Sequence, residues 1–492
     1  MTQDKTIINQ KILIIGSGFA GLGMGIQLMR KGEEDFVILE RANDVGGTWR
    51  DSHYPGIACD VPSHLYSFSF KTNPEWSRVF SPGGEIQSYL RDCAKTEGLL
   101  PKIHFGRDML ASRWDDEKKL WFVETSNGLY SAQILITGTG HLADGHLPNV
   151  KGINDFIGEI FHSADWNHEV SLEGKRVGIV GSGASAIQIL PEVAKLNCEV
   201  TVFQRSAAYV VPRADRVYTE AERRQFRRDP TIIDEVRQQV FWEGEYNYAQ
   251  RRGVDRFLKE AKDMALGHLE NQIKDKDLRA KLTPNYEVGC KRLLISNEYF
   301  PAFTKDNVTL EPSAIKEVNG STAISADGNK FDLDVLILAT GFEAVRPPFA
   351  KRIYGKGGID LDTHWDKGMQ AYQSITVNDY PNLFIINGPN TGLGHNSVVF
   401  IIEAQIDYIL GALEFAKENN VLAIEVSEDA EQKYMEELHI RSQNTVWLDG
   451  GCKSWYVDDR SGRLTLIWPD YAHSFKDENG TFSPDGYMTI TG

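Results

Sequence analysis

Two glycine-rich segments of this chain have the residue types and spacing that suit nucleotide binding. Gly16-Ser17-Gly18-Phe19-Ala20-Gly21 follows the apolar run 11–15, and Gly181-Ser182-Gly183-Ala184-Ser185-Ala186 follows the apolar run 176–180. Glycines at such a turn let the backbone approach a pyrophosphate, and the helix that begins there offers free N–H groups. The pattern predicts two dinucleotide sites, which use Gly16, Gly18 and Gly21 in the first and Gly181, Gly183 and Ser185 in the second.

An ionic residue ends the second strand of each predicted unit. The interval from Gly16 to Glu40 equals the interval from Gly181 to Arg205. A carboxylate at this position accepts hydrogen bonds from ribose hydroxyls, whereas an arginine suits a 2′-phosphate. Glu40 therefore predicts FAD or NAD in the first site, and Arg205 predicts NADP(H) in the second. The alternative interpretation is that both residues form surface ion pairs.

The segment Asp44-Val45-Gly46-Gly47-Thr48-Trp49 contains a second glycine element of the kind common in flavoproteins. We expect Gly47, Thr48 and Trp49 to contact the first cofactor. A flavin site beside a nicotinamide site predicts an oxidoreductase that passes hydride from NADPH to FAD. The chain has no C-x-x-C pair, which argues against a disulfide reductase. Dioxygen remains as the acceptor, since reduced flavin reacts with it directly to give a C4a-(hydro)peroxide.

Composition excludes several classes of protein. The chain has 41% hydrophobic and 25% charged residues, as globular proteins do, and its net charge of −16 argues against nucleic acid as a partner. No apolar run approaches the roughly 18 residues of a membrane span, and no signal peptide is evident at the N-terminus. The five cysteines predict neither a disulfide framework nor a metal site. These features favour a protein of the reducing cytoplasm.

The order of the motifs predicts an α/β fold with two Rossmann-like dinucleotide-binding domains. We expect residues 1–148 to form the first part of the FAD domain and residues 149–338 to form the NADP domain. Residues 339–492 then return to complete the FAD domain. The charged, glycine-poor segment 216–285 predicts a helical insertion within the NADP domain.

The segment between the glycine motifs carries a resemblance to a known family. Phe156-Ile157-Gly158-Glu159-Ile160-Phe161-His162-Ser163-Ala164-Asp165-Trp166 is similar to the F-x-G-x-x-x-H-x-x-x-W pattern of class B flavoprotein monooxygenases. Trp166 makes this segment similar to the type I Baeyer–Villiger monooxygenases within that family. Asn167 differs, because those enzymes usually have Pro or Asp at this position. The motif residues are thus Phe156, Gly158, His162 and Trp166. Taken without the family, His162 and Trp166 equally fit a packed linker.

The segments Tyr54–Pro62, Gly289–Arg292 and Lys453–Tyr456 also resemble this family. By this resemblance Arg292 is the catalytic arginine, Asp60 its carboxylate partner, Lys291 a second contact for the 2′-phosphate, and Trp455 a wall of the nicotinamide pocket. An ordinary salt bridge is the alternative for Asp60 and Arg292, and Cys290 is read as a passive small residue. The resemblance implies further cofactor contacts from Arg41, Val61, Tyr66, Ser206 and Asn390.

The function that this resemblance implies is an FAD- and NADPH-dependent Baeyer–Villiger monooxygenase. Such an enzyme inserts one oxygen atom of O2 into a small ketone to give an ester or lactone, and it also oxidises sulfides in some cases. One alternative is a flavin monooxygenase that oxygenates nitrogen and sulfur, and another is a non-catalytic nucleotide sensor or an NADPH oxidase. The sequence leaves open the size of the substrate and the choice between monomer and homodimer.

Overall fold

The first nucleotide unit is built on a mixed sheet whose central strands are parallel. The computed structural model describes residues 6–491, and its largest sheet has eight strands in the order β17-β4-β5-β6-β1-β2-β3, with β18 also paired to β6. The strands β4, β5 and β6 pair antiparallel, and β1 lies between β6 and β2 in parallel register. Their bounds are β1 (Ile7–Ile15), β2 (Phe36–Leu39), β3 (Ile103–His104), β4 (Met109–Asp115), β5 (Leu120–Thr125), β6 (Gly128–Thr137), β17 (Ile353–Tyr354) and β18 (Leu383–Ile385).

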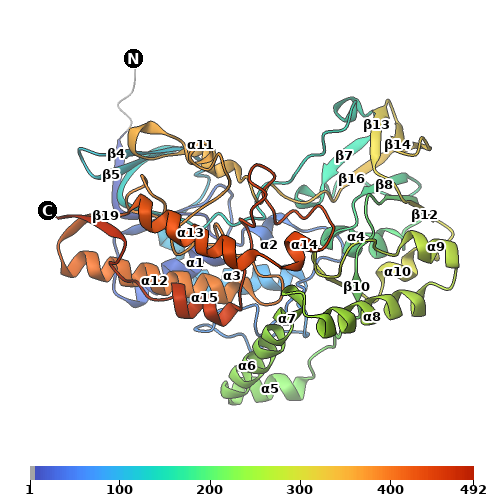
Figure 1. Cartoon of the computed structure of the whole chain (residues 1–492), viewed down its shortest axis with the longest axis horizontal. Helices are drawn as coiled ribbons and strands as arrows, with labels where there is room; N and C mark the ends of the chain where they lie inside the picture. The colour runs from blue at the N-terminus through green and yellow to red at the C-terminus, as the bar shows by residue number, and fades with distance from the viewer. Residues whose placement is uncertain (1–5, 492) are drawn as a thin grey trace.

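The second nucleotide unit is a parallel sheet of five strands in the order β12-β9-β8-β16-β7. These strands are β7 (Glu159–His162), β8 (Arg176–Val180), β9 (Glu199–Phe203), β12 (Val308–Glu311) and β16 (Val335–Leu338). Figure 1 shows this sheet on the right of the molecule and the larger sheet on the left. The α/β fold with two Rossmann-like sheets is confirmed.

The two glycine loops occupy equivalent places in their sheets. Gly16 donates its backbone N–H to Leu39 at 2.8 Å, and Gly181 donates to Phe203 at 3.0 Å. Both loops therefore leave the carboxyl end of the central strand beside the end of its neighbour, where ligands of open parallel sheets bind. The helices that follow are α1 (Phe19–Arg30) and α4 (Ala184–Val193).

Side chains of β1 alternate between two hydrophobic cores. Ile12 and Ile14 pack into the core on one face of the sheet, and Leu13 and Ile15 pack into the core on the other. The first face is covered by α1, α3 (Gly83–Thr96) and α12 (Val398–Glu418), with α15 (Ala472–Asn479) outside α12. Burial on both faces explains why the strand reads as a continuous apolar run.

The charged segment after β10 (Val210–Val211) is helical, as its composition predicts. Its helices are α5 (Glu220–Arg228), α6 (Thr231–Tyr246), α7 (Tyr248–Arg251), α8 (Asp255–Gln272) and α9 (Lys276–Lys281). Thr219 and Glu222 form a reciprocal capping box at the start of α5. Exposed pairs such as Arg256 with Glu260 account for the runs of charge on α8. Figure 1 shows α5 to α8 along the lower side of the molecule and α9 at its right edge.

Shorter elements complete the structure. The remaining strands are β11 (Leu294–Ile295), β13 (Ile315–Asn319), β14 (Thr322–Ser325), β15 (Lys330–Asp332), β19 (Val421–Val426) and β20 (Tyr487–Thr491). The remaining helices are α2 (Thr48–Asp51), α10 (Tyr299–Ala302), α11 (Leu361–His364), α13 (Glu428–Ser442) and α14 (Val446–Asp449), with 3-10 turns at 100–102, 153–155, 163–165, 348–352 and 356–358. None of the helices within residues 6–491 combines the length and apolar character needed to cross a bilayer.

One sequence-based prediction is wrong. The structure joins Cys290 and Cys452 in a disulfide, although the cysteine count and spacing predict none. The two residues lie 162 positions apart in sequence, and folding brings their Cα atoms to 6.2 Å. Spacing arguments detect only local pairs, so they could not find this one. Cys290 is therefore a crosslink and not a passive small residue.

The disulfide predicts the number of free thiols. We expect the denatured, unreduced protein to show three reactive thiols, from Cys59, Cys93 and Cys198, and the reduced protein to show five. Thiol titration in denaturant with and without prior reduction measures this. As a control, Cys452→Ser should show the same count in both conditions. Five thiols in the unreduced wild-type protein would contradict the crosslink.

Candidate functional site

The first glycine loop has the shape of a phosphate cradle. A Cβ atom on Gly21 would lie 1.8 Å from the carbonyl oxygen of Gly16, and Gly16 itself has φ +95°. Gly18 begins α1 without any side-chain cap, so the N–H groups of the first turn remain available to a ligand. The turn therefore has no side chains at the place where a dinucleotide phosphate needs backbone N–H groups. These residues fit the pyrophosphate of FAD.

This loop opens into a cavity of about 1250 Å³, a volume that includes its mouth. Its lining contains eight of the predicted cofactor residues, namely Gly16, Gly18, Glu40, Arg41, Gly47, Thr48, Trp49 and Tyr66. Trp49 donates its indole N–H to the Tyr66 hydroxyl at 3.2 Å, which orients both rings. Gly21 and Val61 do not line the cavity. Gly21 packs against the backbone of Gly16 on the side of the turn away from it.

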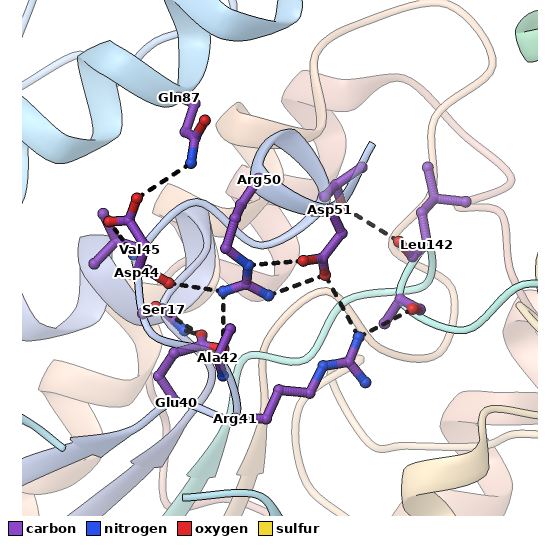
Figure 2. Close-up of polar contacts among 12 residues, drawn as sticks. Ser17, Glu40, Arg41, Ala42, Asp44, Val45, Arg50, Asp51, Gln87 and Leu142 are labelled. Atoms are coloured by element: carbon purple, nitrogen blue, oxygen red, sulfur yellow. Dashed lines mark hydrogen bonds and ion pairs between the residues drawn. The ribbon is translucent and has the colours of Figure 1, made fainter. Parts of the chain in front are cut away.

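Glu40 is the anchor of this site and not a surface ion pair. It is 3% exposed, and its Oε2 accepts the backbone N–H of Ser17 at 2.9 Å and the Ser17 hydroxyl at 2.6 Å. Its Oε1 accepts the N–H of Ala42 and pairs with Arg50 at 2.8 Å. The carboxylate therefore ties the glycine turn to the end of β2 (Figure 2).

Arg50 is a residue that sequence reasoning missed. It pairs with both Glu40 and Asp51, and it donates to the backbone oxygen of Asp44 (Figure 2). Although burial opposes its charge, the hydrogen bonds and charges of Asp51 and Glu40 raise the pKa of Arg50. Arg41, at the mouth, pairs with Asp51 and Asp144. Only its place directly after Trp49 in the glycine segment could have pointed to Arg50.

More of the cavity wall comes from segments outside the two glycine elements of this unit. Residues 107–109, the loop 138–144 and Asn387 line it as well. His141 accepts or donates a hydrogen bond with Thr391, and burial lowers the pKa of this imidazole to about 4, against the opposing effect of Asn387. His141 is therefore neutral near pH 7. These residues come from turns after strands of the large sheet, and their position follows from topology.

The second glycine loop has the same open form. A Cβ atom on Gly181 would lie 2.3 Å from the oxygen of Ala339, whereas Gly183 is exposed and begins α4 without a side-chain cap. Ser185 lies in the first turn of α4. Ser182 donates its hydroxyl to the carbonyl of Ser206 at 2.6 Å, which joins the loop to the end of β9.

Arg205, which follows the second strand of this unit, and Lys291 are close enough for their charges to interact. Burial lowers the pKa of the Lys291 ammonium, and the positive charge of Arg205 lowers it further. Neither residue takes part in any ion pair within residues 6–491. Arg205 is exposed, so the surface ion pair that was its alternative is not formed. Two adjacent cations without an acid partner fit a phosphate dianion, as in the 2′-phosphate of NADP(H).

Asp60 and Arg292 meet between the two nucleotide units. Arg292 donates Nε and Nη2 to one carboxylate oxygen, Oδ2, at 2.8 and 2.5 Å. This differs from a two-oxygen fork, because Oδ1 receives neither bond. Asp60 raises the pKa of Arg292 well above its ordinary value despite burial, and Tyr456 adds to the effect. The two side chains remain about one third exposed, so the guanidinium is fixed yet accessible.

The predicted pocket wall lies next to this pair. Trp455 is 41% exposed, and its ring packs on Tyr456 with centroids 4.6 Å apart. Tyr456 is buried, which raises the pKa of its hydroxyl, while Arg292 and Arg251 oppose that effect. The disulfide at Cys452 joins this loop to the segment that carries Lys291 and Arg292.

Asn390 and the family motif have structural contacts of their own. Asn390 is buried, and its Nδ2 donates to the carbonyls of Leu464 and Ile467 at 2.8 and 3.0 Å. The motif residues pack where the chain enters the second sheet. Gly158 lies against the carbonyl of Asp334, and Trp166 packs against Phe161. His162 accepts a hydrogen bond from the N–H of Ala164, and Phe156 packs against a hydrophobic core. These contacts are those of a packed linker between the nucleotide units.

The cradle at Gly21 predicts a sharp effect of one methyl group. We expect Gly21→Ala to lower the amount of FAD that purified protein retains by about tenfold or more, because the added Cβ cannot coexist with the Gly16 carbonyl. Flavin absorbance after desalting measures this, with circular dichroism to confirm folding. Gly183→Ala is the matched control, since its Cβ meets nothing within 4 Å. Full flavin content in Gly21→Ala would contradict the cradle.

Comparison with known proteins gives a consistent result. A family model described as "Pyridine nucleotide-disulphide oxidoreductase" matches residues 13–219, which include both glycine loops. A Baeyer-Villiger monooxygenase of Pseudomonas aeruginosa is 40% identical over 488 residues, covering 98% of this chain and 92% of that protein. Another from Streptomyces coelicolor is 41% identical over 478 residues, covering 95% and 90%.

Solved structures share the whole fold. A cyclohexanone monooxygenase from Rhodococcus sp. bound to NADP+ superposes with a TM-score of 0.87 at 24% identity, covering 99% of this chain and 100% of that one. An oxidized steroid monooxygenase bound to NADP gives a TM-score of 0.84 at 26% identity, covering 98% and 100%. With full-length relatives at 40% identity and this shared fold, the chain belongs to the flavin-dependent Baeyer–Villiger monooxygenases.

Proposed function

We propose that this chain oxygenates small ketones to esters or lactones with NADPH and O2, and that Arg292, held by Asp60, is the group that makes the reaction possible. The observation that carries the proposal is the Asp60–Arg292 pair, which is fixed by two hydrogen bonds and still partly exposed. The first glycine loop and Glu40 hold FAD, and the second loop holds NADP(H). The bound flavin, once reduced, supplies the electrons and activates dioxygen.

Arg292 supplies a permanent positive charge where negative charge develops on oxygen. Addition of an oxygen nucleophile to a ketone carbonyl places negative charge on the carbonyl oxygen, and a fixed cation stabilises it without reorganisation. Asp60 raises the pKa of Arg292, so the guanidinium retains its proton throughout. Asp60 also fixes the orientation of the guanidinium through Nε and Nη2, and these two hydrogen bonds do not use Nη1, which is left for the ligand.

Lys291 and Arg205 set the choice of coenzyme. Burial and the positive charge of Arg205 both disfavour the positive charge of Lys291. A 2′-phosphate relieves this repulsion and accepts hydrogen bonds from both groups, whereas a 2′-hydroxyl does neither. The pair therefore favours NADPH over NADH.

Replacement of Arg292 separates ketone oxygenation from sulfide oxygenation. We expect Arg292→Ala to lower ester formation by about a hundredfold or more, because attack on a carbonyl needs an anionic nucleophile beside a cation. Oxidation of a sulfide, which needs an electrophile, should fall less. Product analysis under labelled O2 measures both, with flavin content to confirm the holoenzyme.

The wild-type enzyme in the same assay tests the alternatives. Labelled sulfoxide with no labelled ester would favour a nitrogen- and sulfur-oxygenating enzyme. NADPH consumption with release of hydrogen peroxide alone would indicate an oxidase, and a colourless protein would indicate a nucleotide sensor. Equal loss of both products in Arg292→Ala would contradict the role given to Arg292.

The coenzyme preference should depend on Arg205. We expect Arg205→Ala to raise the KM for NADPH by about tenfold or more, since a charge-assisted bond to phosphate is lost, with little change for NADH. Steady-state kinetics with each coenzyme measure this. Arg224→Ala, which removes another exposed arginine from helix α5, is the control. Equal changes for NADPH and NADH would contradict the assignment.

A further inference from the structure

Arg251 is a buried arginine without an acidic partner. It ends helix α7 of the insertion and is only 5% exposed. Burial lowers the pKa of its guanidinium to about 10, Tyr456 opposes this, and Arg292 adds to it. The group is therefore still charged at neutral pH. No ion pair within residues 6–491 includes Arg251, which is unusual because buried charges in proteins are normally paired.

The protein contacts of Arg251 hold the guanidinium but do not neutralise it. Nη2 donates to the carbonyl of Gly394 at 2.7 Å, and Nη1 donates to Oε1 of Gln250. Glu245, a buried carboxylate of the insertion, is used by His395, Asn396 and His473. A neutral amide and a neutral carbonyl orient the cation and leave its charge uncompensated.

Two other buried donors near Arg251 lack a partner. Nε2 of Gln250 and Nε1 of Trp447 have no hydrogen-bond acceptor, although both side chains are at least nine-tenths buried. The Gln250 amide is oriented by Arg251, so its NH2 group cannot simply be exchanged with its oxygen. Arg251 and Trp447 both pack against Gly394. A Cβ atom added to Gly394 would lie 3.2 Å from Nε of Arg251 and 3.7 Å from Cε2 of Trp447. We call Gln250, Arg251 and Trp447 the donor cluster.

The donor cluster lies next to the catalytic arginine. Nη1 of Arg251 is 3.0 Å from the position that a Cβ atom on Gly289 would take, and Gly289 stands three residues before Arg292. Tyr456 lies close enough to both guanidinium groups for each to affect its pKa. Gly394 belongs to the segment between β18 and α12 that also contains Asn387 of the flavin cavity. The positive charge of Arg292 lowers the pKa of Arg251, so the donor cluster lies within electrostatic range of the guanidinium that a ketone must reach.

From this geometry we propose that the donor cluster binds a carboxylate carried by the ketone substrate, so that the preferred substrates are oxo acids. This proposal rests on the proposed function and names its substrate class. A carboxylate accepts from the planar guanidinium and from the two orphaned N–H groups at once, and it supplies the missing negative charge. A neutral ketone satisfies neither requirement.

The cofactor phosphates are not the anion that the cluster requires. The pyrophosphate groups of the two cofactors bind at the uncapped N-termini of α1 and α4. The 2′-phosphate of NADP(H) binds to Arg205 and Lys291. Arg251 stands on the helical insertion and contacts Gly289 and Gly394 instead of either glycine loop. A substrate anion is the charged group that reaches this position beside Arg292.

The first test uses the wild-type holoenzyme. Levulinate and its longer straight-chain homologues are compared with their methyl esters, which keep the ketone and remove the charge. We expect the KM for the best acid to lie about tenfold or more below that of its ester at neutral pH. Equal values, or a preference for every ester, would overturn the proposal. If neither acids nor esters yield oxygenated product, the proposed function itself fails.

The second test uses variants in the same comparison. Arg251→Met should raise the KM for the acid about tenfold or more and leave the ester, the KM for NADPH and flavin content nearly unchanged. Trp447→Phe, which removes the indole N–H from the cluster together with part of the ring volume, should raise the KM for the acid by a smaller factor and leave the ester nearly unchanged. Arg256→Met on the exposed face of α8 is the control. An equal loss for acid and ester in Arg251→Met would show a structural role and overturn the proposal.

Discussion

The bond between Asp60 and Arg292 constrains the whole molecule, because its two ends come from loops of different nucleotide units. Asp60 lies in a loop of the first nucleotide unit, and Arg292 precedes β11 in the second. Their contact requires that the units keep one relative position. Gln188 of α4 helps to hold the two units in this position, because its side chain forms hydrogen bonds with the Tyr54 hydroxyl and with the backbone N–H and carbonyl of Ala58. Arg213 adds a bond to the carbonyl of Cys59, directly before Asp60.

Although the protein is acidic, several cations without an ion-pair partner lie near Arg292 or its neighbour Lys291. The net charge is −16, yet Arg205, Lys291 and Arg251 each lack a carboxylate partner within the described chain, and Arg292 has a single one. Burying unpaired positive charge costs free energy, so such groups persist where a ligand supplies the anion. Glu40 shows the opposite arrangement: it is fully satisfied by Ser17, Ala42 and Arg50, and it serves the shape of the glycine turn.

Local patterns revealed the nucleotide loops, because a strand, a glycine turn and a helix are adjacent in sequence and follow one geometric rule. The Asp60–Arg292 pair was accessible only through resemblance to a family, since 232 positions separate the two residues. The disulfide, the bond of Arg50 to Glu40 and the charge of Arg251 escaped both approaches. Each depends on tertiary packing, which brings a partner to the side chain in the first two cases and leaves Arg251 without an acidic partner in the third. Residue types and their spacing in sequence do not predict such packing.

The crosslink between Cys290 and Cys452 also limits motion at the site. Three peptide units separate Cys452 from Trp455, so the Cα atom of Trp455 lies no farther than about 10 Å from the Cα atom of the crosslinked Cys452. The same anchor stands two residues before Arg292. The loop that carries the aromatic wall is therefore tied covalently, at Cys452, to the segment that carries the guanidinium.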